Sequence, residues 1–538
     1  MTRALAVRAR LVPGPDARFQ RLYDPILDAL AHDGPLARER FETRWSDTAA
    51  LTALAAAKRG PLPPALTAEL TEYHRRLGAS PASLAALDRL GRGEAVCAIA
   101  GQQPAPLGGP LYSLHKVADA AGLARSAEER TGIPCVPMFW MHGEDSDFDE
   151  IRDAVVSDAT LALRELTLPA SAHVEGGLLG NLPLEPLAAL DAEALAAWTT
   201  HPAHADVEAV LARSTARARD LGEAHSALML ALFADSGLVV VDPRLPAFRA
   251  AAREIVDRYL AKADAMAAAA RAAGDRLESA IGRRPLDGRA LESFVFAIED
   301  GRRHKITPVE ARQGGAALTL SPSVALRPVV QDGVFPTVAM ACGPGEAAYL
   351  AQLREVFAGL AVRAASPVPR FGATWLPPAA VSLIEETGAD PWEVIHATDV
   401  VLRHHAEQQV PAETRAALDR ARREANDGLA DFAEASRRVD QSLPQMVESA
   451  RGKVDYQFAR LEEGLIAKVR HRIERQHPEW LRVRYFLLPG DRLQERRLAS
   501  LEVVAWRGMG TGAEVSELAA DHARRLAAGV LEHLVLEL

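Results

Sequence analysis

Lys116 is the residue whose type and position most suggest chemistry. The chain has 6 lysines against 56 arginines, so a retained lysine is informative, because a compact ammonium suits phosphates and carboxylates. Lys116 lies behind the Gly- and Pro-rich segment 101–109, early in a helix predicted to begin at Pro110. A helix N-terminus and an ammonium can together hold an anion. The Gly-Lys-Ser/Thr element of a P-loop is absent, so a connection without a ligand is the alternative.

A cluster of acidic residues follows in the segment HGEDSDFDE at 142–150. Carboxylates this close repel one another unless they bind a cation, bind a cationic substrate or share a proton. Glu144, Asp145 and Asp147 are the candidates, and His142 offers a base or a polar contact. We expect these to be exposed loop carboxylates that act on a substrate and contribute little to stability. A solvated acidic turn is the alternative.

Two further segments supply a carboxylate and two guanidinium groups. Glu346 lies in the first turn of a helix that follows the turn GPGE, where it either offsets the helix dipole or binds an amine. Arg327 and Arg370 lie near predicted strand ends and could clamp substrate carboxylates. Cys342 ends a predicted strand and is interpreted as structural, with a nucleophile or a metal thiolate as the alternative. Neither CxxC nor HExxH occurs, and we predict no metal centre of that kind.

The elements around these residues predict a parallel sheet. Apolar runs typical of buried strands occupy residues 94–100, 133–141, 237–242 and 337–342. Gly-rich turns and helices follow two of them, the second helix spanning 347–360, and strand–turn–helix units of this kind build doubly wound α/β domains. The predicted fold is therefore α/β, a Rossmann-like doubly wound parallel sheet with helical insertions. Ligands in such sheets bind outside the carboxyl ends of the strands.

The sequence changes character near residue 384. Residues 413–475 are rich in helix formers, and Leu418, Ala425, Phe432, Val439 and Met446 recur every seven residues, although Ser436 interrupts this seam and Pro444 should kink the helix. A coiled-coil hairpin with 384–410 as the returning partner is predicted, with an ordinary long helix on the core as the alternative. The predicted domains are 1–383, the core with helical connecting insertions; 384–478, an antiparallel helical coiled-coil arm; and 479–538, a C-terminal segment that ends in an amphipathic helix and rejoins the core.

Composition narrows the class of protein. The 538 residues are 48% hydrophobic and 25% charged, values typical of globular proteins, and the net charge of −10 (62 − 72) disfavours binding along a nucleic-acid backbone. Three cysteines in so long a chain indicate a reducing compartment. The N-terminal residues lack the pattern of a secretory signal, and no uncharged apolar run of membrane-spanning length occurs. We expect a cytoplasmic protein without nucleic-acid or membrane partners.

Several segments together resemble one known family. They are GQQPAPLGGPLYSLHK at 101–116, PMFWMHGEDSDFDEI at 137–151, SPSVALRPVVQD at 321–332, GPGEAAYLAQL at 343–353, PRFGAT at 369–374 and PGDRLQER at 489–496. In content and order they are similar to the BshC family, the proposed cysteine-adding enzymes of bacillithiol biosynthesis. The length and the long C-terminal coil also fit.

The resemblance implies a Rossmann-type core like that of class I aminoacyl-tRNA synthetases, a coil that supports a homodimer, and a reaction that joins L-cysteine to glucosaminyl-malate. The site positions that it carries over are Gly101, Gln102, Gln103, Lys116, Glu144, Asp145, Asp147, Gly343, Glu346 and Gln352. The family usually has His where this chain has Ser146, and Gly where it has Cys342. If that His moves a proton, His142 or His115 must replace it, or the activity is altered.

An amide-forming ligase of EC 6 type needs an activated carboxyl group and a neutral amine. ATP or ADP with Mg²⁺ is the expected cofactor, with the 101–116 turn and Lys116 on phosphate, and Glu144, Asp145 and Asp147 on Mg²⁺ or the cysteine ammonium. Arg327 and Arg370 are assigned to the malate carboxylates. We expect catalytic roles for Lys116, Glu144, Asp145, Asp147 and His142, and substrate binding by Gly101, Gln102, Gln103, Gly343, Glu346, Gln352, Arg327 and Arg370. The alternatives are a non-catalytic dimeric scaffold or thiol-binding module, and a related ligase for another amino sugar.

Overall fold

A parallel sheet with the strand order β11-β10-β2-β3-β6 lies at the centre of the larger of two units. The structure, a computed structural model, describes residues 5–11 and 24–538. The strands are β2 (Val96–Gln102), β3 (Cys135–Met141), β6 (Val239–Val241), β10 (Thr337–Cys342) and β11 (Ser366–Pro369). The chain moves outward from β2 through β3 to β6, and then returns to the other side of β2 with β10 and β11. This doubly wound order confirms the predicted α/β class and places the switch point between β2 and β10.

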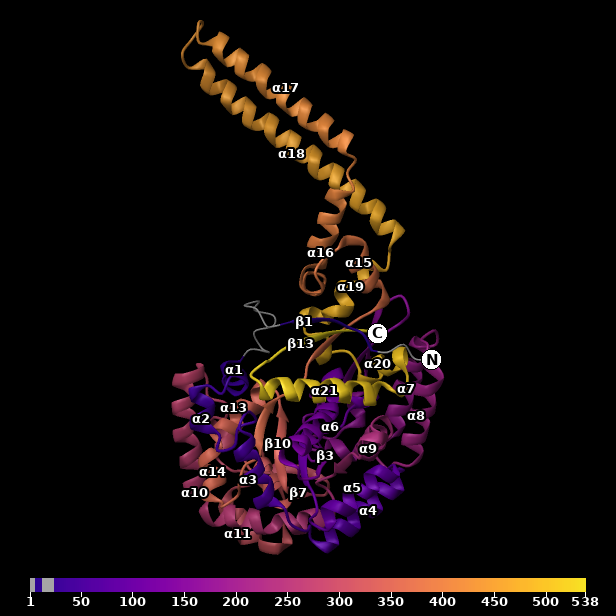
Figure 1. The fold of residues 1–538 in the computed structure, drawn as a ribbon, viewed down its shortest axis with the longest axis vertical. Coiled ribbons are helices and arrows are strands. Elements are labelled where there is room, and N and C mark those ends of the chain that lie inside the picture. The colour runs from indigo at the N-terminus through magenta and orange to yellow at the C-terminus, as the bar shows by residue number, and fades with distance from the viewer. Residues whose placement is uncertain (1–4, 12–23) are drawn as a thin grey trace. The chain divides into compact units, whose positions relative to one another are not determined.

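Helices cover both faces of this sheet, which explains why its strands are apolar on both sides. In β2, Val96 and Ala98 face a cluster with α6 (Leu111–Thr131) and α21 (Thr511–Ala527), whereas Cys97 and Ile99 face a cluster with α10 (Pro246–Ile281). Helix α21 lies against α6 (Figure 1). Gly122 allows this close approach, because a Cβ there would lie 2.5 Å from the Ala520 nitrogen.

Three smaller sheets complete the first unit. Their strand orders are β1-β13-β12, β8-β7-β9 and β4-β5. The strands are β1 (Val7–Leu11), β4 (Asp153–Ser157), β5 (Leu163–Thr167), β7 (Val295–Glu299), β8 (Arg302–Lys305), β9 (Thr319–Pro322), β12 (Ala373–Leu376) and β13 (His533–Glu537). The chain therefore ends in a strand that follows the amphipathic helix α21, not in the helix itself as predicted.

The remaining helices of this unit surround the sheets. They are α1 (Pro25–Ala31), α2 (Pro35–Arg40), α3 (Thr48–Lys58), α4 (Pro64–Leu77), α5 (Pro81–Gly91), α7 (Glu185–Ala197), α8 (His204–Ala216), α9 (Leu221–Leu232), α11 (Pro308–Gly314), α12 (Arg327–Val334), α13 (Pro344–Gln352), α14 (Arg354–Gly359) and α20 (Ser500–Arg507). The helix predicted over 347–360 is thus two helices, separated by a tight turn at Leu353. Pro110 caps α6 instead of opening it.

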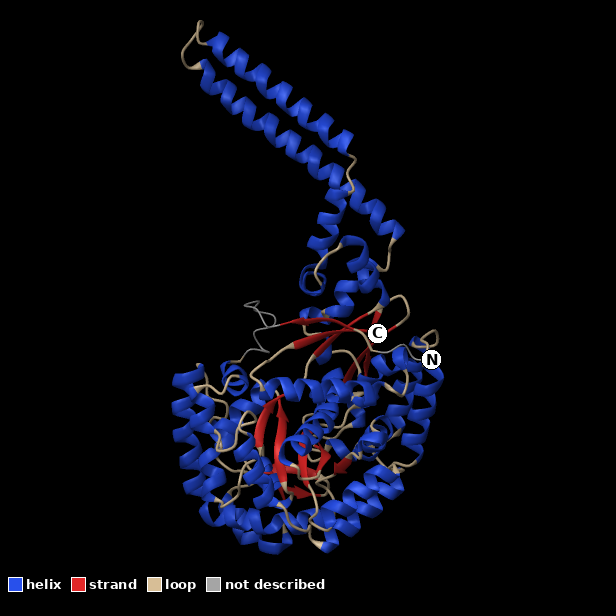
Figure 2. Ribbon diagram, viewed as in Figure 1, coloured by secondary structure: helices blue, strands red, loops and turns tan. Residues whose placement is uncertain are grey.

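The second unit, Leu376–Leu488, is helical (Figure 2). It contains α15 (Pro378–Thr387), α16 (Pro391–Gln408), α17 (Ala412–Ser436), α18 (Leu443–Gln476) and α19 (Trp480–Leu487). The principal partner of α17 is α18, and Arg422 of α17 pairs with Asp455 of α18 at 2.9 Å. The predicted partner segment 384–410 does contact the long helices, since α16 packs against α18 and Arg403 pairs with Glu463 at 2.6 Å. It is not the partner of α17, because the chain reverses between Ser436 and Leu443 and α17 pairs with α18.

None of the helices within the described ranges has an apolar stretch long enough to cross a membrane.

Candidate active site at the sheet edge

The carboxyl ends of three neighbouring strands bring together most of the predicted site residues. Gln102 ends β2, His142 follows β3, and Gly343 and Glu346 follow β10. β2 and β10 are neighbours on either side of the switch point of the sheet, so the segments that follow them lie side by side at this edge. The predicted edge site therefore exists as a cluster of side chains.

Lys116 occupies the centre of this edge. Helix α6 runs back along the sheet, and the Lys116 side chain reaches toward the helix N-terminus, as helical side chains do. Its Nζ donates to the Gly101 carbonyl at 2.8 Å and to Gln102 Oε1 at 3.1 Å, and it lies 3.0 Å from Glu346 Oε2. The side chain is only 7% exposed. One ammonium has three N–H donors, and here all three are used.

Glu346 links the Lys116 ammonium to the segment that follows β10. It accepts a hydrogen bond from the Gly343 N–H at 2.9 Å at the start of α13, and it accepts the Lys116 ammonium on the same carboxylate. The carboxylate therefore has a structural role at the helix end and a free lone-pair site as well. Both roles considered for Glu346 in the sequence are compatible with this geometry.

Gly101 makes room for His142. A Cβ at Gly101 would lie 2.5 Å from His142 Nε2 and 3.3 Å from the Trp140 carbonyl oxygen. Backbone bonding fixes the same residue, since the His142 N–H donates to the Gln102 carbonyl at 2.9 Å. The His142 ring can occupy this position because glycine at residue 101 has no Cβ atom.

Replacing Gly101 with alanine should displace the His142 ring and destabilise the fold by about 1–3 kcal/mol, the usual cost of overpacking. Chemical denaturation measures this change. Gly343→Ala is the matched control, because a Cβ there meets nothing closer than 3.6 Å and φ is −78°. Equal stability of Gly101→Ala and Gly343→Ala would contradict the assigned packing.

Two of the predicted glutamines lie at this edge, with different partners. Gln102 donates from Nε2 to the Tyr112 hydroxyl at 3.1 Å while its Oε1 accepts from Lys116. Gln103 turns outward and donates to Glu150 at 2.7 Å. Gln102 is therefore a direct neighbour of the ammonium, whereas Gln103 belongs to the rim.

The acidic loop is not the exposed cluster predicted from the sequence. Glu144 is buried, accepting from Arg249 at 2.7 Å and from the Ser321 hydroxyl at 2.7 Å. Asp145 is largely buried and pairs with Arg327 and Arg303. Asp147 is the exposed one. Arginines from distant segments thus neutralise the first two carboxylates, and the three do not converge.

Burial and charge set the protonation of this loop. Burial alone would raise the pKa of Asp145, but the Arg327 guanidinium, and next Arg303, outweigh it and lower that pKa to about 2. Burial, and next Arg327, hold the pKa of His142 well below its ordinary value. The His142 imidazole is therefore neutral at pH 7, and its lowered pKa makes it a weak base.

Arg370 is directed into a buried ion pair and not into open space. It donates to Glu495 through both terminal nitrogens and to the Phe371 carbonyl at 3.0 Å. Glu495 also accepts from His115 Nδ1 at 3.4 Å, and Trp375 donates to the other ring nitrogen of His115. His115 is fully buried with both ring nitrogens engaged, so of the two histidines considered as a replacement for the missing family histidine, His142 is the one at the edge.

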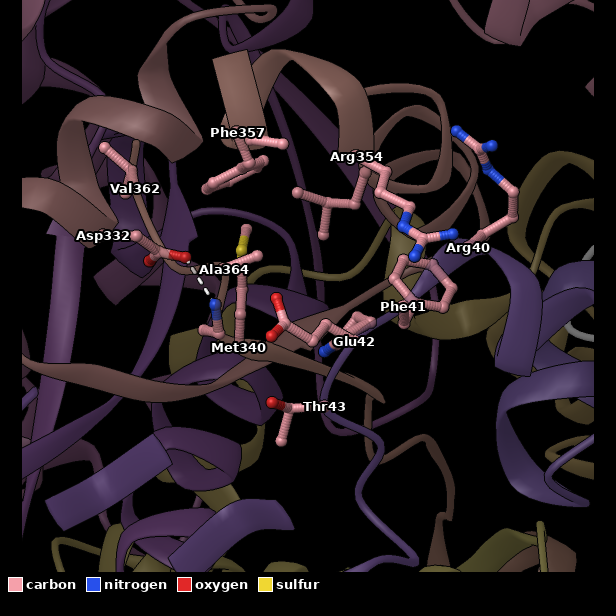
Figure 3. Close-up of a pocket in the computed structure, with 14 residues that line it drawn as sticks. Arg40, Phe41, Glu42, Thr43, Asp332, Met340, Arg354, Phe357, Val362 and Ala364 are labelled. Carbon is pink, nitrogen blue, oxygen red and sulfur yellow. Dashed lines mark hydrogen bonds between the residues drawn. The ribbon is translucent and has the colours of Figure 1, made fainter. Parts of the chain in front are cut away.

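Gln352 and Asp332 lie elsewhere. Gln352 is fully buried and bonds the carbonyls of Ala270 and Leu286, which ties α13 to the end of α10. Asp332 precedes β10, at the opposite edge of the sheet, where it lines a separate cavity and accepts from the Ala365 N–H at 2.6 Å (Figure 3). Both are structural residues in this arrangement.

The N-terminus of α6 does not form the open anion site predicted for it. The Leu111 N–H donates to the Leu498 carbonyl at 2.7 Å, and Ser500 binds the Gly109 and Pro110 carbonyls. Residues of the C-terminal segment therefore cover the helix end that was expected to hold a phosphate.

Metal-ligating side chains do not gather at the edge. Among the residues that the structure describes, no group of three or more His, Cys, Asp or Glu side chains is arranged to hold a metal ion. Cys342 is buried, donates to the Val368 carbonyl at 3.4 Å, and burial raises the pKa of its thiol. This favours the structural interpretation of Cys342.

Sequence reasoning missed Arg303 and gave no role to Glu495. Arg303 lies on β8, which a two-residue turn joins to β7, and Asp300 and Gly301 in that turn both have positive φ. The Asp-Gly pair between two short strands is a hairpin signal that could have located Arg303. Glu495 lies in a segment more than 120 residues beyond Arg370, and no spacing in the sequence indicates that these two side chains meet.

The fold and this edge define a Rossmann-like α/β protein with a helical coiled-coil unit. Comparison with known proteins agrees: the family model described as bacillithiol biosynthesis BshC, N-terminal Rossmann-like domain, matches residues 26–371, and the model described as bacillithiol biosynthesis BshC, C-terminal coiled-coil domain, matches residues 373–510. The chain belongs to the BshC family.

Two relatives illustrate the similarity. A protein of Koribacter versatilis named "Putative cysteine ligase BshC" is 30% identical over 455 residues, which cover 81% of this chain and 84% of the relative. A protein of the same name from Symbiobacterium thermophilum is 29% identical over 475 residues, 81% and 84% of the two chains. The resemblance seen in the sequence motifs is confirmed.

Proposed function

We propose that this chain is a carbon–nitrogen ligase that joins L-cysteine to the amine of glucosaminyl-malate, which gives bacillithiol. The observation that carries the proposal is the buried Lys116 ammonium at the switch point, between the Gly101 carbonyl, Gln102 and Glu346. The printed names of the relatives and the family models point to the same reaction class.

The edge residues supply what amide formation requires. A substrate carboxyl oxygen can replace the Gln102 amide oxygen on Lys116, where the ammonium would stabilise negative charge on that oxygen. Glu346 has lone pairs left to accept an N–H of the incoming amine. The neutral His142 imidazole, beside Gly101 at the same edge, can accept a hydrogen bond from the amine. These roles use side chains already within one cluster.

Activation of the carboxyl group by ATP with Mg²⁺ remains a prediction. When bound, the nucleotide would convert a carboxylate oxygen into a leaving group. The residues predicted to hold it do not fit that role here, since arginines neutralise Glu144 and Asp145, and Leu498 covers the start of α6. We therefore assign no residue to a nucleotide. We place the reaction in the cytoplasm, consistent with the three free cysteines.

Turnover by the purified protein tests the proposal. Cysteine and glucosaminyl-malate are incubated with and without ATP, and mass spectrometry follows the product whose mass is the sum of both less one water. Formation of that product supports the proposal. Cysteine binding without turnover would favour a thiol-binding module, and turnover only with another amino sugar would favour a related ligase.

We also propose that the helical unit forms a homodimer. Three apolar side chains near the turn of the α17–α18 hairpin are exposed: Phe432 by 59%, Val439 by 81% and Met446 by 64%. Exposed apolar side chains that cluster in this way mark association surfaces, and full burial of each stabilises a dimer by about 1.5–3 kcal/mol.

Replacing Phe432 and Val439 together with glutamate should therefore give a monomer by light scattering, with unchanged circular dichroism. Val174→Glu with Val309→Glu adds the same charge at two exposed valines of the other unit and should leave the dimer intact. A dimer that survives in the Phe432 and Val439 variant would show that the hairpin end is not the interface.

A further inference from the structure

The cavity beside the acidic loop contains more buried positive than negative charge. Arg303 and Arg327 both donate to the same oxygen of Asp145, Oδ1. Their side chains are 8% and 15% exposed, and all three residues line a cavity of about 560 Å³. Two guanidinium groups therefore share one carboxylate as their hydrogen-bonded counter-ion.

Neighbouring carboxylates do not supply the missing charge. Glu144 attracts both Arg303 and Arg327 electrostatically, but its hydrogen bonds go to Arg249 and Ser321. Three arginines, Arg249, Arg303 and Arg327, therefore still outnumber the two carboxylates of Glu144 and Asp145 by one. At the cavity rim, the Glu150 and Glu310 carboxylates are exposed, so solvent screens their charge. The remaining charged rim residues, Arg289, Glu292 and Lys305, are exposed, and solvent screens them. The excess charge therefore belongs to the buried part of the cavity.

Arg303 also keeps unused bonding capacity. One terminal nitrogen donates to Asp145 at 3.2 Å, the other donates to the Pro322 carbonyl at 2.9 Å, and the buried Nε has no partner. The guanidinium carbon lies 3.9 Å from the centre of the Phe296 ring, which fixes its plane. A buried N–H without a partner is costly unless a ligand or water satisfies it.

We propose that this cavity binds a carboxylate of the substrate, with Arg303 and Arg327 as its ligands and Asp145 as the residue that holds both guanidinium groups in place. The assignment rests on the proposed function, and it identifies the dicarboxylate end of glucosaminyl-malate as the occupant. Planar guanidinium groups match carboxylates in pairs of hydrogen bonds, which a point charge does not do. Arg370, assigned to the same role from the sequence, is already paired with the buried Glu495 carboxylate.

L-malate alone is the probe for calorimetric titration of the full-length protein. Arg303→Met keeps an unbranched apolar side chain at this position and removes the guanidinium group, so malate affinity should fall at least tenfold. Arg302→Met is the matched control, because Arg302 is the neighbouring residue on β8 and is exposed, and it should bind malate like the unmodified protein. Arg303→Lys, which keeps the charge, serves if Arg303→Met does not fold, and it should also weaken malate binding.

Equal malate affinity in the Arg303 variants and the unmodified protein would overturn the proposal. So would Arg303-dependent binding of inorganic phosphate or ADP without binding of malate, because the cavity would then take phosphate. Turnover separates this inference from the proposed function. A rise in KM for glucosaminyl-malate but not for cysteine in Arg303→Met supports both. Malate binding that depends on Arg303, without any turnover, would support the carboxylate site and contradict the proposed ligase activity. Turnover with an unchanged KM for glucosaminyl-malate in Arg303→Met would support the ligase activity and contradict the carboxylate site.

Discussion

Replacing Lys116 with arginine should lower turnover of cysteine at least tenfold, about 1.4 kcal/mol, while the protein stays folded. The Lys116 ammonium lies in a buried space where three oxygen acceptors meet at 2.8–3.1 Å. Arginine keeps the charge but is longer and planar, so it cannot place one nitrogen among these three acceptors. Rate measurements at saturating and limiting cysteine test this expectation.

Lys262→Arg is the matched control, because Lys262 is an exposed lysine that donates to the Gly359 carbonyl at 2.8 Å. It should leave turnover unchanged. Full activity in Lys116→Arg would mean that the buried Lys116 ammonium has only a structural role and takes no part in the reaction.

Asp145→Asn should destabilise the protein by about 3–5 kcal/mol, because it leaves the Arg303 and Arg327 guanidinium groups buried without a counter-charge. This expectation reverses the one from the sequence, in which Asp145 was an exposed loop residue. Thermal and denaturant unfolding measure the change. Asp147→Asn alters the exposed carboxylate two residues away and should have almost no effect.

The pH dependence of the unfolding free energy should reveal the contribution of Asp145. The folded-state pKa of Asp145 is about 2 against an ordinary value of 3.8, so its contribution is present above about pH 3.8 and is lost as the pH falls toward 2. The difference corresponds to about 2 kcal/mol. An unfolding free energy with the same acid dependence in Asp145→Asn and the unmodified protein would contradict the assigned ion pairs.

The sheet edge could be predicted because its residues lie next to elements that are visible in the sequence. The apolar runs gave β2, β3 and β10, and each is followed by a segment with a polar candidate: Gln102, His142 and Glu346. Since parallel strands end at a common edge, these residues had to be neighbours. The observed bounds of these strands differ from the predicted bounds by about two residues, and this difference does not change which residues meet at the edge.

The ion-pair partners could not be predicted in the same way. Arg249, Arg303 and Glu495 come from segments that lie more than 100 residues from the side chains they bind. Carboxylates in a loop look the same in a sequence whether solvent or a distant arginine faces them. The acidic loop was therefore expected to be exposed, and the role of Arg370 was misjudged for the same reason.

In the helical unit, the predicted seven-residue repeat extends across a reversal of the chain. The seven-residue repeat from Leu418 to Met446 continues through a turn, so Phe432 and Met446 lie on different helices. Pro444 lies in the first turn of α18, a position that proline favours at helix starts. It marked a new helix and not a kink in a continuous one.

The most direct test of the edge site is a double-mutant cycle between Lys116 and Glu346 in the cysteine turnover assay. Lys116→Met and Glu346→Gln should each lower kcat, and the double variant should lose little more than the more severe single variant, because the two side chains act as one unit. Circular dichroism confirms that each variant is folded. If the two losses instead add fully as free energies, or if Lys116→Met turns over cysteine at the rate of the unmodified protein, the reaction does not take place at this edge.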